Sequence, residues 1–386
     1  MSAHQPSRFS RFRLVAGLML FALSLLAVFE APLNLLWKIS ILVTEWGQVL
    51  AILAFLLIIS SRKNRPPAAL GLTAMVLSLT SLFRAVPIAN QLPLQLQSVF
   101  GEAPATIAAL ARAKPLDFVD LIRGVDFLDM PYQSLVYSQI ENQELRLDFY
   151  RPANSLKPAP CVIVIHGGSW RSGDSQQLAP LNSYLAARGY AVAAINYRLA
   201  PRWRFPAARD DVIAALVYLK AHADSLRLDP QRFVLLGRSA GGHLALLAAY
   251  TQHDPAIRGV ISLYGPADLH WSYAHPGNPL VIDTHDILQA FLGGSPEQVP
   301  AQYDAASPIR FVDANTPPTL LIHGGRDELV SIRQSERLAE RLAQARVSHV
   351  LVKLPWATHA EDFNFSGPMG QISTYAVERF LAAVMR

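Results

Sequence analysis

The stretch at residues 233–244 most constrains the fold of this chain, because it reads as a short buried strand, a sharp turn and a helix that begins at once. The turn carries Ser239 between Gly237 and Gly241. Side chains at the two glycine positions would collide with the neighbouring strand and helix. Such a turn lifts the serine hydroxyl to the mouth of a sheet. The pattern alone is a weak signal for a functional serine, so the sequence around it must support that interpretation.

Strand and helix patterns alternate on both sides of this turn. Predicted strands cover residues 161–165, 190–196, 257–264, 319–323 and 348–354, and predicted helices cover residues 175–188, 206–221 and 331–345. The first of these strands is apolar throughout, as expected where both faces are covered. Alternating polar and apolar residues at 134–137 and 145–150 predict antiparallel strands at the sheet edge. We therefore predict an α/β fold with a doubly wound, mostly parallel sheet over residues 132–386.

Three apolar segments, at about residues 14–29, 39–60 and 68–89, open the chain. Each approaches the length of about 20 residues that a bilayer core requires. We predict a transmembrane anchor of about three helices over residues 1–90. The basic leader of the first segment would also suit a cleaved signal peptide. No small-residue cleavage site follows it, which favours an uncleaved anchor.

The basic residues of the apolar region predict its orientation. Three arginines precede the first segment and three basic residues lie between the second and third, whereas the first loop carries only Lys38. Because such clusters stay in the cytoplasm, three spans place the rest of the chain on the periplasmic or extracellular side. A third segment that failed to cross would leave it in the cytoplasm. Glu45 could pair with Arg84 inside the membrane, or both could extend to the interface.

The remaining composition excludes several classes of function. The formal net charge is +5, but it comes from the apolar region, and the arginines elsewhere are scattered, so nucleic-acid binding is not expected. The single cysteine, Cys161, cannot form an intramolecular disulfide. No metal, phosphate-loop or dinucleotide motif occurs, so no cofactor or metal is expected. Residues 91–131 combine prolines with helical spacing and predict a helical linker or cap.

Five motifs in one order carry a resemblance to a known family. They lie at residues 166–170 (HGGSW), 197–201 (YRLAP), 205–208 (FPAA), 237–244 (GRSAGGHL) and 317–327 (PPTLLIHGGRD). Residues 133–386 resemble an α/β-hydrolase, in the esterase branch that includes hormone-sensitive-lipase-like and kynurenine-formamidase-like enzymes. The resemblance implies a membrane-anchored serine hydrolase that cleaves carboxylic esters through an acyl-enzyme intermediate. It also implies the order serine, acid, histidine along the chain.

Catalysis by a serine needs an imidazole to take its proton and a carboxylate to hold the imidazole in the right tautomer. We expect Ser239 to be the nucleophile, His359 the general acid and base, and Asp327 its carboxylate partner. Asp268 follows the preceding predicted strand and is the alternative acid, but the position of Asp327 matches the hydrolase pattern better. His359 is followed by Ala360, where the family usually has glycine.

The negative oxygen that forms during the attack needs backbone N–H donors. The amide of Ala240, at the start of a helix, should supply one. The loop of Gly167, Gly168 and Ser169 should supply the others, because glycines let the main chain approach closely. Ser169 stands where related enzymes often have a third glycine. Which of the three amides points inward stays open.

The insertion between Tyr264 and Pro317 is too long for a simple loop, and its aromatic residues indicate a substrate pocket, a lid or a small satellite core. His243 and His323 are expected to be packing or turn residues. An acyltransferase or a peptidase would use the same catalytic residues, and a catalytically silent binding module at the membrane is the alternative from another class. The partners expected are an ester substrate and the lipid bilayer. The acyl chain length and the oligomeric state stay open.

Overall fold

A computed structural model describes residues 8–62, 64–102, 111–153, 157–177 and 179–386. Within them, the centre of the fold is an eight-stranded sheet in the order β1-β2-β4-β3-β5-β6-β7-β8. The strands are β1 (Tyr132–Ile140), β2 (Gln143–Tyr150), β3 (Ala159–Ile165), β4 (Ala191–Ile195), β5 (Leu228–Arg238), β6 (Ile257–Leu263), β7 (Thr319–Gly324) and β8 (His349–Leu354). β2 pairs antiparallel with β1 and β4, and all other neighbours are parallel. The predicted mostly parallel sheet with an antiparallel edge is confirmed.

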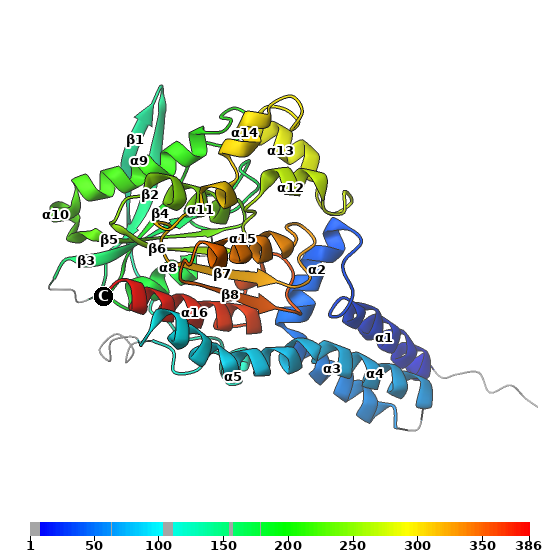
Figure 1. The fold of residues 1–386 in the computed structure, drawn as a ribbon. Coiled ribbons are helices and arrows are strands. Elements are labelled where there is room, and N and C mark those ends of the chain that lie inside the picture. Colours follow the sequence, from blue (N-terminus) through cyan, green and yellow to red (C-terminus); the bar gives the residue numbers. More distant parts are fainter. Residues whose placement is uncertain (1–7, 63, 103–110, 154–156, 178) are drawn as a thin grey trace, which may run out of the picture.

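Helices cover both faces of this sheet (Figure 1). They are α7 (Asp120–Arg123), α8 (Ala179–Ala186), α9 (Ala207–Ala221), α10 (Ala223–Leu226), α11 (Ala240–Gln252), α12 (Leu269–Ala274), α13 (Thr284–Leu292), α14 (Pro300–Ala305), α15 (Arg333–Gln344) and α16 (Pro368–Val384), with 3₁₀ turns η1 (Pro308–Phe311) and η2 (Glu361–Phe363). One buried cluster packs α9, α11 and α15 on one face, and a second packs α8 and α16 on the other. The alternating pattern of the sequence thus yields a three-layer α/β fold.

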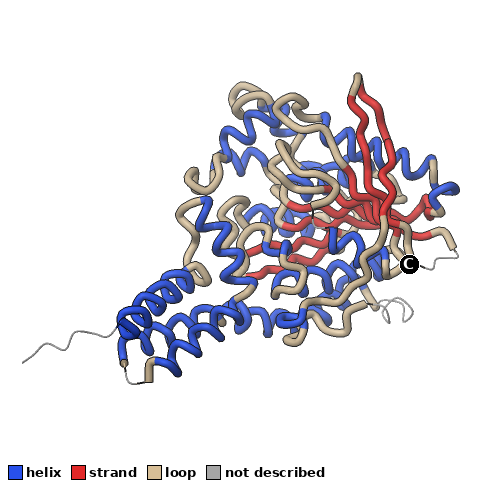
Figure 2. The backbone as a smooth tube through the Cα atoms, turned by 180° about the vertical axis from the view of Figure 1, so that it is seen from behind, coloured by secondary structure: helices blue, strands red, loops and turns tan. Residues whose placement is uncertain are grey.

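The apolar first quarter of the chain forms five helices with two different surroundings. They are α1 (Arg8–Leu25), α2 (Asn34–Glu45), α3 (Gly47–Ser60), α4 (Arg65–Ser78) and α5 (Thr80–Phe100). Helices α1, α3 and α4 pack together and project from the sheet domain as a separate unit, which we call the lobe (Figures 1 and 2). Helices α2 and α5 lie against the sheet domain instead.

The expectation of three transmembrane helices is corrected by the structure. The second apolar segment is broken at Trp46, where α2 and α3 meet at an angle of 79°. Helix α3 has 14 residues, and at about 1.5 Å per residue it falls short of the roughly 30 Å bilayer core. Among the described residues, one helix, Arg65–Phe100, is long and apolar enough to cross a membrane, or two are if the bent pair counts as one span.

Helix α5 explains why the hydropathy of the third segment was misleading. Its apolar face is buried against the sheet domain, together with α16 and β8. Leu82, Ala85 and Ala89 of the third segment are buried there, and beyond it the Phe100 ring meets the Phe380 ring edge to face at 4.9 Å. Half of the third apolar segment is therefore part of the protein core, where apolar surface is removed from water without lipid.

The predicted pairing of Glu45 with Arg84 is wrong. Arg84 is exposed on α5. Glu45 is buried at the start of α16, where its Oε1 accepts a hydrogen bond from the amide of Met369 at 3.3 Å. The carboxyl group of Glu45 lies within hydrogen-bonding reach of that of Glu361, in η2. Their two Oε2 atoms have no other partner in the described part of the chain, so a proton shared between the carboxyl groups satisfies both.

The buried carboxyl of Glu361 makes stability dependent on pH. Burial raises the pKa of Glu361 to about 8, although hydrogen bonds from the Thr358 amide and the Thr44 hydroxyl oppose the shift. The folded state therefore keeps a proton that the unfolded chain releases above its ordinary pKa of 4.5. We expect stability to fall as the pH rises from 4.5 towards about 8.

The substitution Glu361→Gln tests this expectation. Glutamine keeps the accepting oxygen for Thr44 and Thr358 and resembles the protonated acid, so the variant should have a higher Tm than wild type near pH 8 and a flatter dependence of Tm on pH. Thermal unfolding between about pH 5 and 8.5 measures both quantities. The exposed Glu340 provides the control Glu340→Gln, which should follow wild type. A wild-type Tm that is constant across this range would contradict the shared proton.

Residues 91–131 were predicted to form a helical linker or cap. Among the described residues of this range, helix α5 continues to Phe100, and α7 is a single turn. Residues 103–110 lie outside the described part of the chain. The remainder runs along α16, where Gln371 Oε1 accepts a hydrogen bond from the amide of Asp117 at 2.7 Å and Ser366 Oγ from that of Val125 at 2.8 Å. This segment therefore ties α5 to the outer face of the sheet domain.

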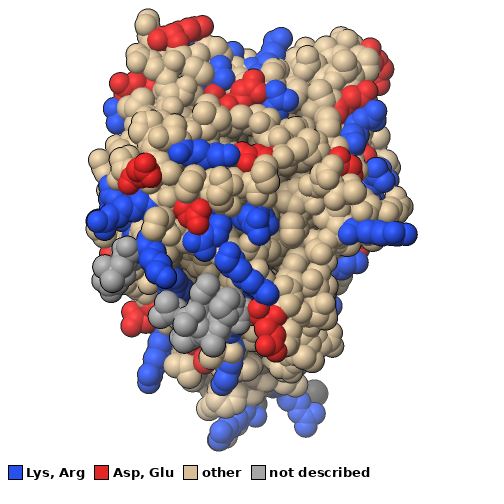
Figure 3. Space-filling view, turned by 60° about the vertical axis from the view of Figure 1, so that its left-hand side comes forward, with Lys and Arg blue, Asp and Glu red and all other residues tan. Residues whose placement is uncertain are grey.

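Charged side chains are mixed over the surface of the sheet domain. On the face in Figure 3, basic and acidic side chains alternate without a continuous basic stripe. Several form ion pairs, such as Lys220 with Asp254 at 2.6 Å and Arg171 with Asp286 at 2.7 Å. The face in this view lacks the extended basic surface that tracks a nucleic-acid backbone.

Candidate active site

Ser239 stands alone in the turn between β5 and α11. Its backbone has φ +51° and ψ −121°, a strained conformation for a residue with a side chain. The turn is held by a hydrogen bond from the Ser239 amide to Leu263 O at 2.9 Å. A Cβ atom at Gly241 would lie 2.1 Å from Ile165 O, so only glycine fits beside the serine. The sequence pattern and the local packing agree on this turn.

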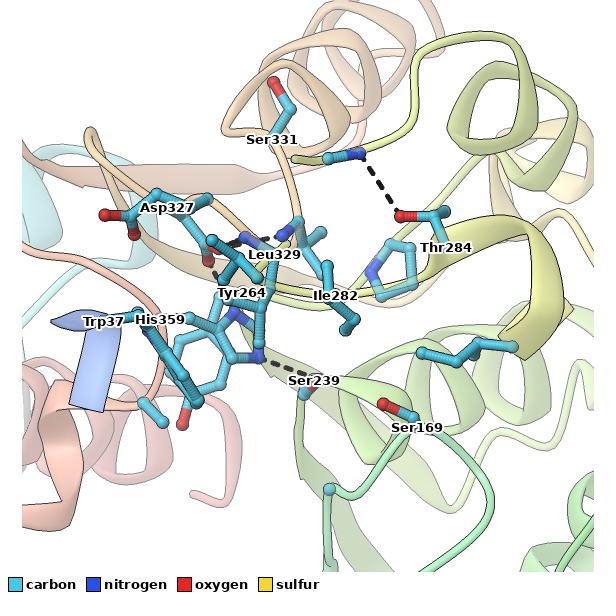
Figure 4. Close-up of a pocket in the computed structure, with 18 of the residues that line it drawn as sticks. Trp37, Ser169, Ser239, Tyr264, Ile282, Thr284, Asp327, Leu329, Ser331 and His359 are labelled. Atoms are coloured by element: carbon cyan, nitrogen blue, oxygen red, sulfur yellow. Dashed lines mark hydrogen bonds and ion pairs between the residues drawn. The ribbon is translucent and has the colours of Figure 1, made fainter. Parts of the chain in front are cut away.

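The structure brings Ser239, His359 and Asp327 together at the carboxyl ends of three parallel strands (Figure 4). The serine hydroxyl is 2.9 Å from His359 Nε2, and His359 Nδ1 is 2.6 Å from Asp327 Oδ2. With Nδ1–H donating to the carboxylate, Nε2 is left as an acceptor for the serine proton. This hydrogen-bond chain is the geometry that activates a serine nucleophile.

Asp327 is held as a fixed, buried anion. Its Oδ1 accepts hydrogen bonds from the amides of Leu329 at 2.9 Å and Val330 at 2.8 Å. Burial disfavours the charge, but His359 and a hydrogen bond from His323 outweigh it and hold the pKa of Asp327 well below its usual range. The carboxylate therefore stays ionised at any pH at which the protein would work, and it keeps His359 in one orientation.

His323 is a second histidine at the carboxylate of Asp327, where the sequence predicted a packing or turn residue. It is fully buried at the end of β7. Its Nε2 lies 2.8 Å from Val330 O and 3.3 Å from Asp327 Oδ2, and its Nδ1 lies 2.7 Å from Ser335 Oγ. Its position at the end of β7, four residues before Asp327, was the available signal. His323 positions the carboxylate rather than meeting the pocket.

Tyr264 and Arg238 support the other side of the histidine. The Tyr264 ring meets the His359 ring edge to face at 4.5 Å. Its hydroxyl donates to Asp362, which also pairs with the guanidinium of Arg238, the residue before the nucleophile. Arg238, inside the GRSAGGHL motif, therefore helps to hold Asp362 and Tyr264 beside His359, a role that the sequence alone did not indicate.

The loop after β3 lies beside the serine, and its amides differ in availability. The amide of Gly167 donates to Gln177 Oε1 at 2.7 Å. Within the described residues, the amides of Gly168, Ser169 and Ala240 have no acceptor in the protein. Gly168 has φ +114°, and a Cβ atom there would lie 2.1 Å from Ser172 O. The loop therefore needs glycine at position 168 to reach this conformation.

The other candidates from the sequence lie apart from the catalytic hydrogen-bond chain. Asp268 accepts a hydrogen bond from the amide of Trp271 at 3.0 Å and pairs with Arg337 at 2.8 Å, so it caps α12 and is engaged away from His359. His243 is fully buried, and burial lowers its pKa to about 4. It accepts from Trp170 Nε1 at 3.2 Å and lies 2.6 Å from Ala306 O. It is a packing residue, as expected.

The serine opens into a cavity of about 980 Å³. The insertion after β6 supplies one wall, including Trp271, Ile282 and Leu288. The aromatic residues of the insertion join the main core, because the buried Phe291 belongs to the cluster that contains α9 and α11, and its ring stacks on Trp170 at 4.3 Å. The insertion therefore contributes to the pocket and extends the main core, and the expected separate satellite core is not formed by the described residues.

The opposite wall comes from α2 and the connection before it, which the sequence predicted to be part of the membrane anchor. Asn34, Trp37 and Lys38 line the cavity, and Figure 4 places Trp37 beside His359. No sequence pattern marks this contact, because these residues lie far from Ser239, Asp327 and His359 in the chain. The first quarter of the chain thus contributes directly to the pocket.

The connection between α1 and α2 is hydrogen-bonded to the loop that carries Asp327. The amide of Ala31 donates to Glu328 Oε1 at 3.0 Å. The Arg326 guanidinium donates to Leu26 O at 3.1 Å and to Phe29 O. The two residues that flank Asp327 therefore both hold the entry to α2, and the lobe is linked to the catalytic centre through them.

Comparison with solved structures places this fold among esterases. The bacterial heroin esterase superposes with a TM-score of 0.60 at 25% identity, over 74% of this chain and 99% of that chain. A thermophilic esterase of Thermogutta terrifontis superposes with a TM-score of 0.53 at 26% identity, over 64% of this chain and 89% of that chain. The sheet domain is thus of the α/β-hydrolase kind that the sequence motifs indicated.

Curated relatives and a family model cover the same part of the chain more closely. LipM of Mycobacterium tuberculosis, a probable carboxylic ester hydrolase, is 33% identical over 240 residues, which are 58% of this chain and 54% of LipM. Esterase LipC of the same organism is 34% identical over 248 residues, 60% of each chain. The matches thus span little more than half the length of these relatives. The BD-FAE model matches residues 147–342, which include Ser239 and Asp327. Since that match extends over half of the sequence, the chain belongs to the BD-FAE family.

Proposed function

We propose that this protein is a serine hydrolase that cleaves carboxylic esters through an acyl-enzyme intermediate. The observation that carries the proposal is the hydrogen-bond chain from Ser239 through His359 to Asp327, at the base of an open cavity. The names of the relatives, which are esterases, support the same reaction class. The chemistry follows from the groups present and needs no cofactor.

The reaction proceeds by acylation and then deacylation of Ser239. Ser239 Oγ attacks the ester carbonyl carbon while its proton passes to His359 Nε2. The tetrahedral intermediate collapses, the C–O bond to the alcohol breaks, and the leaving alcohol takes the proton from His359. A water molecule then attacks the acyl-enzyme with His359 again as base, and the acid is released as Ser239 recovers its proton.

We assign the oxyanion donors to the amides of Gly168, Ser169 and Ala240. The support for this choice is that these amides have no acceptor within the described residues, whereas that of Gly167 is already engaged by Gln177. Ala240 also begins α11, so the positive end of a helix dipole faces the developing charge. One such donor is typically worth about 3 to 4 kcal/mol in the transition state.

The purified full-length protein tests the reaction class. It should hydrolyse p-nitrophenyl acetate, and a fluorophosphonate should label one residue, identified by peptide mass spectrometry as Ser239. Added alcohol, amine and peptide acceptors distinguish an acyltransferase or a peptidase by their products. A protein that neither hydrolyses the ester nor reacts with the fluorophosphonate would instead be a binding module.

We further propose that the lobe inserts into a lipid bilayer. Its residue distribution is opposite to that of a water-soluble bundle. Small residues lie between its helices, namely Gly17, Ala51, Ala54, Gly71 and Ala74. Large apolar side chains point outward, namely Val15, Leu18, Met19, Ile52, Leu53, Phe55, Leu56, Leu72 and Val76. This arrangement is typical of helices that pack within lipid.

The charges of the lobe support a direction of insertion. Arg8, Arg11, Arg62 and Arg65 are exposed where α1 begins and where α3 is followed by α4, at the end of the lobe away from the sheet domain (Figure 1). Helices α3 and α4, of 14 residues each, match a bilayer only where it thins around them. In that arrangement, the excess of positive charge on cytoplasmic loops favours this tip on the cytoplasmic side and the sheet domain on the opposite side. Alkaline phosphatase fused after Met130 should be active in bacterial cells, and an inactive fusion would reverse the orientation.

A further inference from the structure

Helix α2 crosses the direction of the lobe. It meets α3 at 79°, so a lobe inserted along the membrane normal leaves α2 nearly parallel to the membrane surface. Its outward face carries Leu35 and Leu42, which are exposed and spaced i and i+7. The exposed Lys38, at i+3, also reaches the lining of the cavity. Such a face, apolar with one lysine that reaches to the headgroups, is typical of a helix in the membrane interface.

The inward face of the same helix forms a wall of the catalytic cavity. Asn34 and Trp37 line the cavity together with Ser239. Trp37 Nε1 is buried and has no hydrogen-bond partner within the described part of the chain. An indole at the interface combines an apolar body with one donor that is available to an ester oxygen. A single helix therefore separates the serine from the membrane surface.

The second wall meets α2 at the mouth of the cavity. The amide of Asn34 donates to Leu280 O at 3.0 Å, and its side chain donates to Val281 O at 2.8 Å. Leu33, Leu35 and Leu280 flank this junction, and each exposes between 45% and 68% of its surface. The mouth is thus bordered by apolar side chains that continue the exposed apolar surface of the lobe.

We propose that the substrate is an ester held in the bilayer by a long hydrocarbon chain, and that it reaches Ser239 from the membrane between α2 and the insertion. The inference rests on the proposed function and names its substrate class. Every buried methylene adds to the preference of the chain for lipid, so passage through water is the costly route. A mouth at the interface lets the ester carbonyl enter while the remainder of the chain stays in lipid.

The test compares two arrangements of the same components. Full-length protein is reconstituted into phosphatidylethanolamine and phosphatidylglycerol vesicles, and 4-methylumbelliferyl palmitate is placed either in those vesicles or in separate ones. Entry from the bilayer predicts that the palmitate in the same vesicles is cleaved about tenfold faster or more, because transfer of such a chain through water is slow. Equal rates in the two arrangements would overturn the inference.

Soluble 4-methylumbelliferyl acetate distinguishes failure of bilayer entry from failure of the proposed esterase function. Cleavage of the acetate without cleavage of the palmitate in the same vesicles would refute bilayer entry and leave the esterase intact. Failure to cleave either ester would refute the proposed function, and the inference with it. Both esters release the same fluorophore, so their rates are compared directly.

Charge substitutions at the mouth provide the structural control. Leu35→Glu and Leu280→Glu should each lower the ratio of palmitate to acetate rates by about tenfold, because a carboxylate at the interface is costly. Val217→Glu is the matched control, since Val217 is 60% exposed on α9, far from the lobe (Figure 1). It should leave the ratio unchanged. Ratios that are equal in all three variants and wild type would overturn the entry route.

Discussion

Replacing Ser239 with alanine is expected to lower kcat for p-nitrophenyl acetate hydrolysis by about 10⁶-fold, because no acyl-enzyme can form without the hydroxyl. His359 is 4% exposed and lies against Tyr264, so it remains in place and can at best activate a water molecule. The residual rate would come from the oxyanion donors and substrate binding. The variant should also lose its reaction with a fluorophosphonate.

Two controls separate loss of chemistry from loss of fold. Ser225→Ala changes an exposed serine whose hydroxyl bonds only to His222 O at 3.0 Å, and it should retain full activity. Ser239→Ala should have a Tm no lower than that of wild type, because the strained residue keeps its backbone and loses only one oxygen. Activity of Ser239→Ala within about a hundredfold of wild type would refute the assignment of the nucleophile.

The sequence indicated the core of the site because the relevant signals are local. An apolar run followed by a glycine-flanked serine specifies β5, the turn and α11 without reference to the rest of the chain. Asp327 and His359 each follow a predicted strand, and parallel strands bring their carboxyl ends to one edge of the sheet. Placement after parallel strands therefore brought the candidates to one edge, and the order serine, acid, histidine implied by the family resemblance selected Asp327 over Asp268.

The lobe shows what such local signals omit. Hydropathy reports how strongly a segment avoids water, but not whether lipid or protein receives it. At the break, Glu45 accepts from the amide of Met369 and the Trp46 ring contacts the Phe363 ring, and Leu79 packs against the cluster that contains α16. These are tertiary contacts, which hydropathy does not report. The partner of Glu45 is a second acid, Glu361, which a rule of opposite charges cannot anticipate. The sequence likewise could not place Trp37 at the cavity, because that contact joins segments that are distant in the chain.

Asp327→Asn is expected to reduce kcat by about 10⁴-fold while the protein stays folded. The surroundings of Asp327 fix the orientation of the new amide. Its oxygen must face the amides of Leu329 and Val330, which are donors at 2.9 and 2.8 Å. The amide nitrogen then faces His359 Nδ1, and the imidazole must accept there and carry its proton on Nε2. In that tautomer it cannot take the proton of Ser239.

The matched control for this prediction is Asp268→Asn, at the other candidate acid. The asparagine keeps an oxygen for the Trp271 amide and loses only the ion pair with Arg337, at 2.8 Å, so activity should stay within about threefold of wild type. A larger loss in Asp268→Asn than in Asp327→Asn would exchange the two assignments. The expected order follows from distance alone, since Asp327 is 2.6 Å from the imidazole and Asp268 is engaged at α12.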